Sequence, residues 1–520
     1  MPDRSRGGAL FSVFDRRGSA ELARALAAAG HALYATGGTR AHLAASGLDA
    51  RDVGELTGFP ALFDGRVKTL HPKIFGAILA DRRNPAHVEE AARFEIPRLD
   101  YVVVNLYPFE KTVAKPGASL EEALEQVDIG GVSLLRAAAK NFENVTVLSD
   151  PAQYADVLAA LPAGLDAAAR KRLATRAFER TAEYDAAIAR YLEAGLLANE
   201  LPGSLALTIP LVQPLRYGEN PQSRAAFYLA REGRLPEQLH GKALSYNNLL
   251  DLDACLRLLA RARVPMLAHQ RSDDHRAAIV KHTVPCGVAE RPAVADAVRA
   301  TLDADPISAF GGIIACDGPI DAASAEALSE FFLEIVAAPA FEDAALQRLR
   351  KKKNLRIMRY EPALPQQLMR EIEVRSALGG VLAEDDDPAA TPERWEVVSR
   401  RAPSDAEWRD LAFAWDVVRH VKSNGVVVVK DLSARGICAG QTNRVSAVAI
   451  AAQRAGEHAR GGSCASDGFF PFPDGLLAAA DAGCSAVIAP SGSIRDAEVV
   501  AAANERDIAL VFSTYRYFLH

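Results

Sequence analysis

The segment Gly65–Pro72 gathers side chains that could act on a charged substrate. It reads Gly-Arg-Val-Lys-Thr-Leu-His-Pro, with two cations, a hydroxyl and an imidazole inside six residues. Cations and a hydroxyl at this density suit a phosphorylated or enolate-like molecule. A solvated basic loop would show the same spacing, so charge alone leaves both interpretations open.

Two glycine-rich segments could bind an anion or begin a helix. Thr36-Gly37-Gly38-Thr39 lies between a predicted strand and a predicted helix, where backbone N–H groups and the helix dipole favour negative charge. Ser12, at the end of the first predicted strand, could join it. Asp128 precedes Gly130 and Gly131 at the start of another predicted helix. Each segment also fits a bland interpretation, an ordinary turn or a helix cap.

Lys281 and His282 form a candidate acid–base couple at the end of an apolar run over residues 277–280. A neighbouring ammonium favours the neutral imidazole, which can accept a proton. A surface loop with a chance pairing is the alternative. Zinc nucleobase deaminases need a glutamate two residues after the histidine and a C-x-x-C, but Val284 stands there and no such cysteine pair follows. We therefore predict no catalytic metal.

Alternating strands and helices must position these groups. The pattern predicts an α/β fold with a parallel sheet in the first region. A helical repeat of apolar residues extends to Tyr191, and prolines interrupt the chain from residue 202 onward. We predict one domain over residues 1–199 and a second region over 200–520. The expected strands cover residues 9–14, 31–35, 101–105, 144–148, 277–280, 486–489 and 508–512, and an expected helix covers 20–29.

Composition narrows the class of protein. The chain has 520 residues, 49% hydrophobic residues and a net charge of −6, which disfavours broad nucleic-acid or membrane-surface binding. Six cysteines without a C-x-x-C favour a reducing compartment, and no apolar run reaches membrane-span length. We expect a cytoplasmic enzyme that binds small molecules and neither nucleic acid nor a membrane.

Several long motifs in one order, from Ala9 to His520, resemble the bifunctional aminoimidazole carboxamide ribotide (AICAR) formyltransferase and inosine monophosphate (IMP) cyclohydrolase family. The telling stretches are GRVKTLHP at 65–72, NLYPF at 105–109, DIGG at 128–131, RYGENP at 216–221, SAFGG at 308–312 and SDGFFPFPDG at 466–475.

The resemblance implies two activities. A formyl group passes from 10-formyltetrahydrofolate to AICAR, and the product, FAICAR, is then cyclised and dehydrated to IMP. It also implies an N-terminal methylglyoxal-synthase-like domain with a parallel sheet, followed by a transformylase region of two cytidine-deaminase-like α/β subdomains without zinc. The expected partners are these small molecules and a second copy, in a homodimer with transformylase sites at the subunit interface.

The resemblance also assigns residue roles. For formyl transfer, His282 is the implied base, Lys281 its partner and Asn424 an assisting group. For ring closure it implies Lys68, Tyr107, Asp128 and Lys140. The implied nucleotide-binding residues of the first domain are Ser12, Arg16, Thr36, Gly37, Gly38, Thr39, Arg66 and Thr69. Those of the second region are Arg216, Tyr217, Asn248, Phe310, Gly311, Arg444, Phe469 and Arg516, with Asp474 facing the folate.

Some positions depart from the family pattern, namely Phe14, Arg16, Thr283-Val284 and Thr442-Asn443. Arg16 replaces a common lysine and keeps an anion contact, whereas Val284 puts one substrate hydrogen bond in doubt. Two other functions compete with the family interpretation. A phosphate-eliminating lyase would explain the first domain alone, and a nucleotide-sensing module would need no catalytic lysine or histidine.

Overall fold

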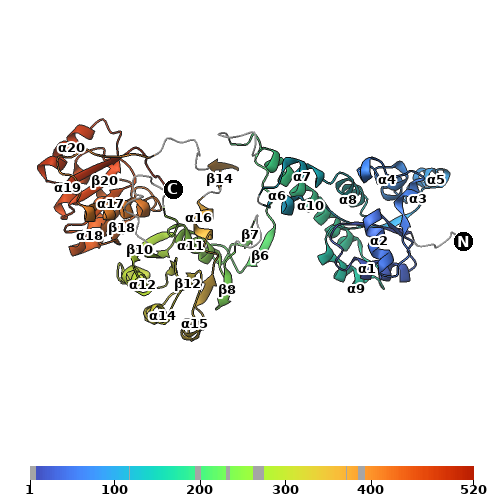
Figure 1. Ribbon diagram of the computed structural model, residues 1–520, viewed down its shortest axis with the longest axis horizontal. Coiled ribbons are helices and arrows are strands. Elements are labelled where there is room, and N and C mark those ends of the chain that lie inside the picture. Colours follow the sequence, from blue (N-terminus) through green and yellow to red (C-terminus); the bar gives the residue numbers. More distant parts are fainter. Residues whose placement is uncertain are drawn as a thin grey trace. The chain divides into compact units, whose positions relative to one another are not determined.

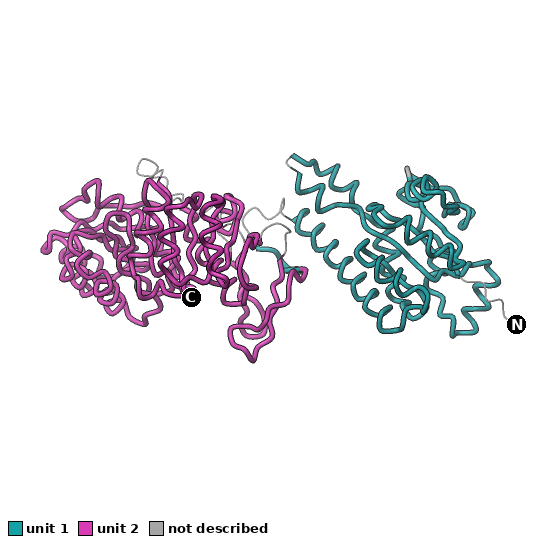
Figure 2. The backbone as a smooth tube through the Cα atoms, turned by 90° about the horizontal axis from the view of Figure 1, so that it is seen from below, with its two compact units in different colours: residues 1–209 teal, residues 210–520 magenta. Residues whose placement is uncertain are grey.

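The chain divides into two compact units, residues 1–209 and 210–520, in a computed structural model (Figure 2). The structure describes residues 7–115, 117–193, 201–229, 235–261, 274–369, 372–384 and 393–520. The predicted boundary at residues 199 and 200 lies outside these ranges. Within them, no helix combines the length and the apolar character that a membrane crossing requires.

The first unit is built on a five-stranded parallel sheet with the order β3-β2-β1-β4-β5. Every strand predicted for this region is present, with ends shifted by one or two residues. The strands are β1 (Gly8–Val13), β2 (Leu33–Ala35), β3 (Arg51–Asp52), β4 (Leu99–Asn105) and β5 (Thr146–Leu148).

Helices cover both faces of this sheet, as a parallel sheet requires. Successive residues of β1 point to opposite faces, so Ala9 and Phe11 join one buried cluster and Leu10 the other. The predicted helix over 20–29 is confirmed as α1. The helices are α1 (Ser19–Ala28), α2 (Gly37–Ala45), α3 (Val53–Thr57), α4 (Pro72–Leu79), α5 (Pro85–Arg93), α6 (Phe109–Val113), α7 (Leu120–Glu125), α8 (Gly130–Lys140), α9 (Tyr154–Ala160) and α10 (Ala167–Glu193), with 3-10 turns at Phe63–Gly65 and Pro151–Gln153.

The second unit is built on a twelve-stranded mixed sheet with the order β16-β21-β20-β19-β17-β18-β10-β9-β11-β12-β13-β8. Its strands are β8 (Glu237–His240), β9 (His275–Lys281), β10 (Val284–Arg291), β11 (Ile313–Cys316), β12 (Ile335–Ala338), β13 (Arg356–Arg359), β16 (Trp395–Val397), β17 (Val426–Lys430), β18 (Ser433–Cys438), β19 (Ser463–Ser466), β20 (Ala486–Pro490) and β21 (Ala509–Ser513). Two small hairpins stand apart from it, β6 (Leu211–Leu215) with β7 (Ala225–Tyr228) and β14 (Glu373–Ala377) with β15 (Gly380–Glu384).

The large sheet contains the same arrangement twice. In each half an antiparallel hairpin, β9–β10 or β17–β18, is followed by three mutually parallel strands, and the first hairpin strand pairs antiparallel with the first of the three. Among the described residues, one helix precedes each hairpin and three helices of seven or more residues follow it. The halves join where β10 pairs with β18, at Ala289 and Ser433.

Four helices of the first half have counterparts in the second, and two short helices of the first half have none among the described residues (Figure 1). Those of the first half are α11 (Tyr246–Arg257), α12 (Val294–Leu302), α14 (Ala322–Ser329) and α15 (Asp343–Leu349), with short α13 (Pro306–Ala309) and α16 (Leu364–Leu368). Those of the second half are α17 (Asp405–Val418), α18 (Arg444–Ala455), α19 (Asp474–Asp481) and α20 (Asp496–Glu505), with a 3-10 turn at Gly456–Ala459.

One continuous core joins the two halves on one sheet face, under α11 and α17. The other face carries two separate cores, one for each set of three helices. A buried arginine also ties the halves, because Arg276 on β9 pairs with Glu290 on β10 and with Asp416 on α17, at 2.7 and 2.6 Å. The two hairpins are therefore held in one rigid frame.

Candidate active sites

In the first unit, the predicted anion-binding residues meet at the carboxyl ends of β1 and β2. Thr36 Oγ1 donates a hydrogen bond to Ser12 Oγ at 3.3 Å, and Thr39 Oγ1 accepts from the Val13 N–H at 3.0 Å. Gly37 and Gly38 form the first turn of α2, so its unpaired N–H groups face the same place. Arg16 lies beside this turn, because a Cβ on Gly38 would be 3.4 Å from its guanidinium.

Asn105, at the end of β4, holds the loop that carries Arg16, and it was not predicted to do so. Its Oδ1 accepts from the N–H groups of Phe14 and Asp15 at 2.6 and 2.8 Å, and its Nδ2 donates to the Asp15 carbonyl at 2.9 Å. The signal in the sequence was its place in the NLYPF motif, after a buried strand. The departing residue Phe14 packs its ring edge-to-face against Tyr107 at 5.9 Å.

A second group of predicted residues gathers around Asp128, at the start of α8. Its Oδ1 accepts from the Gly131 N–H at 2.6 Å, and its carboxylate also faces the Tyr107 N–H and the Lys68 ammonium. Burial raises the pKa of this carboxyl, while the two N–H groups and the Lys68 charge oppose the rise. A Cβ on Gly131 would lie 2.5 Å from the carboxylate, so glycine permits this approach.

Of the other residues of the GRVKTLHP motif, one lies near the start of α8 and two make structural contacts elsewhere. Thr69 is buried, and its Oγ1 lies 2.7 Å from where a Cβ on Gly130 would stand. Arg66 is paired with Glu125 on α7 at 2.5 Å. His71 caps α4, because its Nδ1 accepts from the Lys73 N–H at 3.1 Å.

Lys140 is not brought to this group by the fold. It is the last residue of the eleven-residue helix α8 and is exposed, whereas Asp128 precedes the first turn. At the rise of an α-helix, about 15 Å of helix separates the two ends. Its implied part in ring closure remains a prediction.

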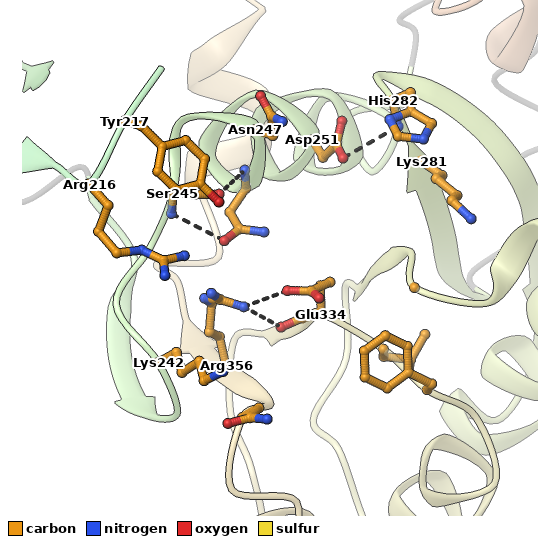
Figure 3. A pocket seen from close by; sticks show the side chains of 15 residues that line it. Arg216, Tyr217, Lys242, Ser245, Asn247, Asp251, Lys281, His282, Glu334 and Arg356 are labelled. Atoms are coloured by element: carbon orange, nitrogen blue, oxygen red, sulfur yellow. Dashed lines mark hydrogen bonds and ion pairs between the residues drawn. The ribbon is translucent and has the colours of Figure 1, made fainter. Parts of the chain in front are cut away.

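In the second unit, a cavity of about 410 Å³ brings together Arg216, Tyr217, Asn248, Lys281, His282 and Gly311 (Figure 3). Its walls come from β6's end, the start of α11, the β9–β10 hairpin and the loops before β12 and β13. Asn248 is committed in part to its own helix, because its Oδ1 accepts from the Ser245 N–H at 3.1 Å in a capping box. Its amide nitrogen has no hydrogen-bond partner among the described residues.

His282 stands at the tip of the β9–β10 hairpin, where Lys281 ends β9. His282 and Thr283 both have positive φ, 56° and 61°, and the His282 side chain is exposed toward the cavity. Lys281 Nζ donates to the Phe310 carbonyl at 2.7 Å, and the Gly311 N–H donates to the Phe332 carbonyl at 2.7 Å. Phe310 itself is 61% exposed and does not line the cavity.

Several cavity residues escaped prediction. Arg356 is 3% exposed and pairs with Glu334 at 2.6 Å, and Lys242 and Asn354 lie close by on the same wall. Lys242 and Asn354 lie in loops and Arg356 begins β13, and none of the three belongs to a recognisable motif. Asp251 also lines the cavity and was not predicted, but the sequence offered a signal for it. It follows Asn248 by three residues on α11 and so shares its helix face.

The remaining predicted transformylase residues form a separate group in the second half, around the buried Asp467. Arg444 pairs with Asp467, Ser423 Oγ donates to Asp467 at 2.5 Å, and the Tyr517 N–H donates to its carbonyl at 3.0 Å. This last bond anchors the C-terminal segment that carries Arg516. Asn424 Nδ2 donates to the Gln441 carbonyl at 2.8 Å.

Two further residues of this group lie on the same segment as Asp467. Phe469 is 37% exposed, and Asp474 is the first residue of α19. None of the five predicted residues of the second half, which are Asn424, Arg444, Phe469, Asp474 and Arg516, lines the cavity of Figure 3. The single chain therefore presents the predicted transformylase residues as two groups.

The fold and the sites define a two-unit α/β protein with a separate cluster of polar side chains in each unit. Two family models match the chain, an MGS-like domain over residues 18–133 and the AICARFT/IMPCHase bienzyme over residues 138–454. Relatives named bifunctional purine biosynthesis protein PurH match almost end to end. The one from Chloroflexus aurantiacus is 48% identical over 98% of both chains, and that from Cereibacter sphaeroides 46% over 99% of both. The one from Rhodopirellula baltica is 44% identical over 98% of both.

The chain belongs to the AICARFT/IMPCHase bienzyme family. It is accordingly a purine biosynthesis enzyme with AICAR formyltransferase and IMP cyclohydrolase activities, the final steps of de novo purine synthesis. The five-stranded parallel sheet belongs to its MGS-like domain, and the large mixed sheet to the region that follows. A lyase acting alone and a non-catalytic sensor are both excluded by this match.

Proposed function

We propose that the two activities are divided along the chain, with ring closure in residues 1–199 and formyl transfer in residues 200–520. The observation that carries the proposal is the separation of the two polar groups. Asp128 and Lys68 lie in one unit, and His282 lines a cavity within the other.

For ring closure, Ser12, Arg16 and the first turn of α2 bind the phosphate of FAICAR, as a helix N-terminus suits an anion. The carboxamide nitrogen attacks the formyl carbon and loses one proton, while the formyl oxygen takes up a proton. The formamido nitrogen then loses its own proton, a C=N bond forms to the former formyl carbon, and the C–O bond breaks so that the oxygen leaves as water. Asp128 moves the proton, because a buried carboxyl with a raised pKa can both accept and return it. The Lys68 ammonium stabilises the charge that develops on the oxygen, and Tyr107 holds Asp128 through its N–H.

For formyl transfer, 10-formyltetrahydrofolate is the proposed donor, and the family implies a formyl donor in any case. The amine of AICAR attacks the formyl carbon while His282 removes an amine proton. The bond from that carbon to N10 of the folate then breaks, and its electron pair returns to N10, which takes up a proton. Lys281 lies beside His282 and Asn424 assists the transfer, whereas Arg216 and Tyr217 orient the ribotide.

We propose no metal in either step. The repeated hairpin-and-three-strand arrangement supports two cytidine-deaminase-like subdomains, but Val284 occupies the place of the deaminase glutamate. In the described part of the chain, no three His, Cys, Asp or Glu side chains are grouped so that they could hold a metal ion. We expect strong chelation to leave both rates unchanged. Six free cysteines favour a reducing cytoplasm.

Two copies of the chain are proposed to complete each transformylase site. The support is the division of the predicted residues, since the group around Arg444 does not line the cavity with His282. In a symmetric homodimer, the His282 group of one copy would face the Arg444 group of its partner.

Complementation tests both the dimer and the base. Alone, His282→Ala and Arg444→Ala should each lose formyl transfer and keep ring closure. A coexpressed mixture should recover about a quarter of the wild-type rate, because half the dimers are mixed and each mixed dimer has one intact site of two. Coexpressing His282→Ala with Lys281→Ala, which alter the same group, is the matched control and should recover nothing. A mixture as inactive as its components would overturn the shared site.

A further inference from the structure

The tips of the two equivalent hairpins share an unfavourable backbone conformation. In the first half, φ is 56° at His282 and 61° at Thr283, and in the second it is 50° at Asp431 and 52° at Leu432. Two-residue turns with positive φ at both positions normally use Asn-Gly or Asp-Gly. A residue other than glycine costs on the order of 1–3 kcal/mol at such a position, so something must hold each tip.

The holding group is a carboxylate on the helix that precedes each hairpin. On α11, Asp251 accepts from the Thr283 N–H through Oδ1 at 2.6 Å and from the His282 N–H through Oδ2 at 3.3 Å. On α17, Asp410 accepts from the Leu432 N–H through Oδ1 at 2.8 Å and from the Asp431 N–H through Oδ2 at 3.0 Å. The same atoms make the same two bonds in both halves.

Both carboxyl groups are largely buried, and their pKa values reflect this. Burial raises the pKa of Asp251 and of Asp410, and the two N–H groups at each tip oppose the rise. Since each carboxylate accepts from two backbone N–H groups, its contribution is to orient the backbone. In Figure 3 the Asp251 carboxylate lies toward the hairpin tip, where it accepts hydrogen bonds from the backbone N–H groups of His282 and Thr283.

The two tips differ in what the held residues face. The first tip places His282 at the wall of the substrate cavity, beside Lys281. The second tip contacts the join between the halves, where Arg291 donates to the carbonyl of Asp431 at 2.9 Å. Neither Asp431 nor Leu432 lines the cavity.

We infer that Asp251 is a positioning residue for formyl transfer, which fixes the left-handed hairpin tip and thereby directs His282 toward the substrate amine. The inference rests on the proposed role of His282. Asp410 accepts the same two backbone hydrogen bonds at a tip whose residues do not line the cavity, so it serves as a matched control.

The test measures kcat and KM for AICAR in the full-length enzyme. Asp251→Asn should lower kcat by about 10- to 100-fold, because an angstrom of misplacement costs a factor of this size. Its KM should change less than about threefold, since the groups that bind the ribotide stay in place. Asp410→Asn loses the same kind of bond and should keep kcat within about threefold. Equal losses of kcat in the two variants would overturn the inference, as would an unchanged kcat for Asp251→Asn.

A second-site variant separates positioning from chemistry and from folding. Glycine accepts positive φ without cost, so Asp251→Asn/Thr283→Gly should regain most of the lost kcat. No recovery in the double variant would show that the carboxylate itself is needed, and the positioning role would be wrong. Should Asp251→Asn be insoluble, the double variant is compared with Thr283→Gly alone and decides the question in the same way.

Assaying His282→Ala beside these variants distinguishes the two proposals. If His282→Ala remains active, the proposed base is wrong whatever Asp251 does. If His282→Ala is inactive and Asp251→Asn retains its kcat, the inference about Asp251 fails alone.

Discussion

The β9–β10 and β17–β18 hairpins have one scaffold and two outcomes. Each follows a helix that supplies a carboxylate, and each tip has positive φ at two residues held by that carboxylate. In each hairpin a lysine ends the first strand directly before the tip, Lys281 in β9 and Lys430 in β17. Only the first tip carries a histidine and borders a cavity that holds other polar groups.

The difference teaches that the hairpin geometry is a structural device of this fold and carries no chemistry by itself. Lys430 shows this directly, because its ammonium donates to the Gly461 carbonyl at 2.6 Å, much as Lys281 donates to the Phe310 carbonyl. What makes the first tip a candidate catalytic site is the imidazole at the first left-handed position and the cavity next to it.

The largest effect is expected when the side chain that distinguishes the two tips, the His282 imidazole, is removed. His282→Ala should reduce formyl transfer by about 10²- to 10⁴-fold, the usual contribution of a positioned general base. Asp431→Asn, at the matching position, should leave the rate nearly unchanged, because Asn tolerates positive φ and Asp431 does not line the cavity that contains His282. Both half-reactions are measured on one preparation, with FAICAR supplied separately. A His282→Ala enzyme retaining more than about a tenth of the rate would show that another group is the base.

A smaller effect extends the comparison to the first unit, where two aspartates begin helices in the same way. Asp128 accepts from the Gly131 N–H before α8, and Asp52 accepts from the Gly54 N–H before α3. Asn keeps an acceptor at either place. We expect Asp128→Asn to slow ring closure by about 10²-fold, with formyl transfer intact.

Asp52→Asn is the control and should affect neither rate. It also caps a helix, but it ends the edge strand β3, whereas Tyr107 follows β4, three places along the sheet. Equal effects of the two variants on ring closure would assign Asp128 to capping alone.

The smallest expected effect concerns stability and distinguishes the ends of the two preceding helices. His420, just after α17, has a buried Nε2 without a hydrogen-bond partner in the described residues. Burial, and then the Arg419 charge, lower its pKa to about 3. The unfolded chain takes up this proton below pH of about 6.5, whereas the folded chain does not, so stability falls as the pH decreases.

Between pH 7 and pH 5 this single group should cost about 2 kcal/mol of the free energy of unfolding. Thermal unfolding of the wild type and of His420→Gln over this range measures it, and the variant should lose less stability. Parallel curves would mean that His420 is protonated in the folded protein. Leu258, just after α11, offers no such group.

Particular residues show how far the sequence could lead. Apolar runs and glycine breaks located β1, β4 and α1 within one or two residues, because local patterning determines these elements. His282 was found through its motif. Asp251 was missed, since a single aspartate on a helix resembles a solvated residue until the distant hairpin tip is placed against it. Lys140 shows the reverse, because the resemblance grouped it with Asp128, whereas α8 places the two residues at its opposite ends.

The sequence by itself determined the family, the two α/β regions and the types of group available for each reaction, because motifs and hydrophobic periods are local properties of the chain. Only the tertiary structure decided which groups meet. Contacts such as Asp251 with Thr283, Asp128 with Lys68 and Arg444 with Asp467 join residues 23 to 60 positions apart. Such contacts depend on how strands pair and helices pack, and no spacing along the chain encodes them.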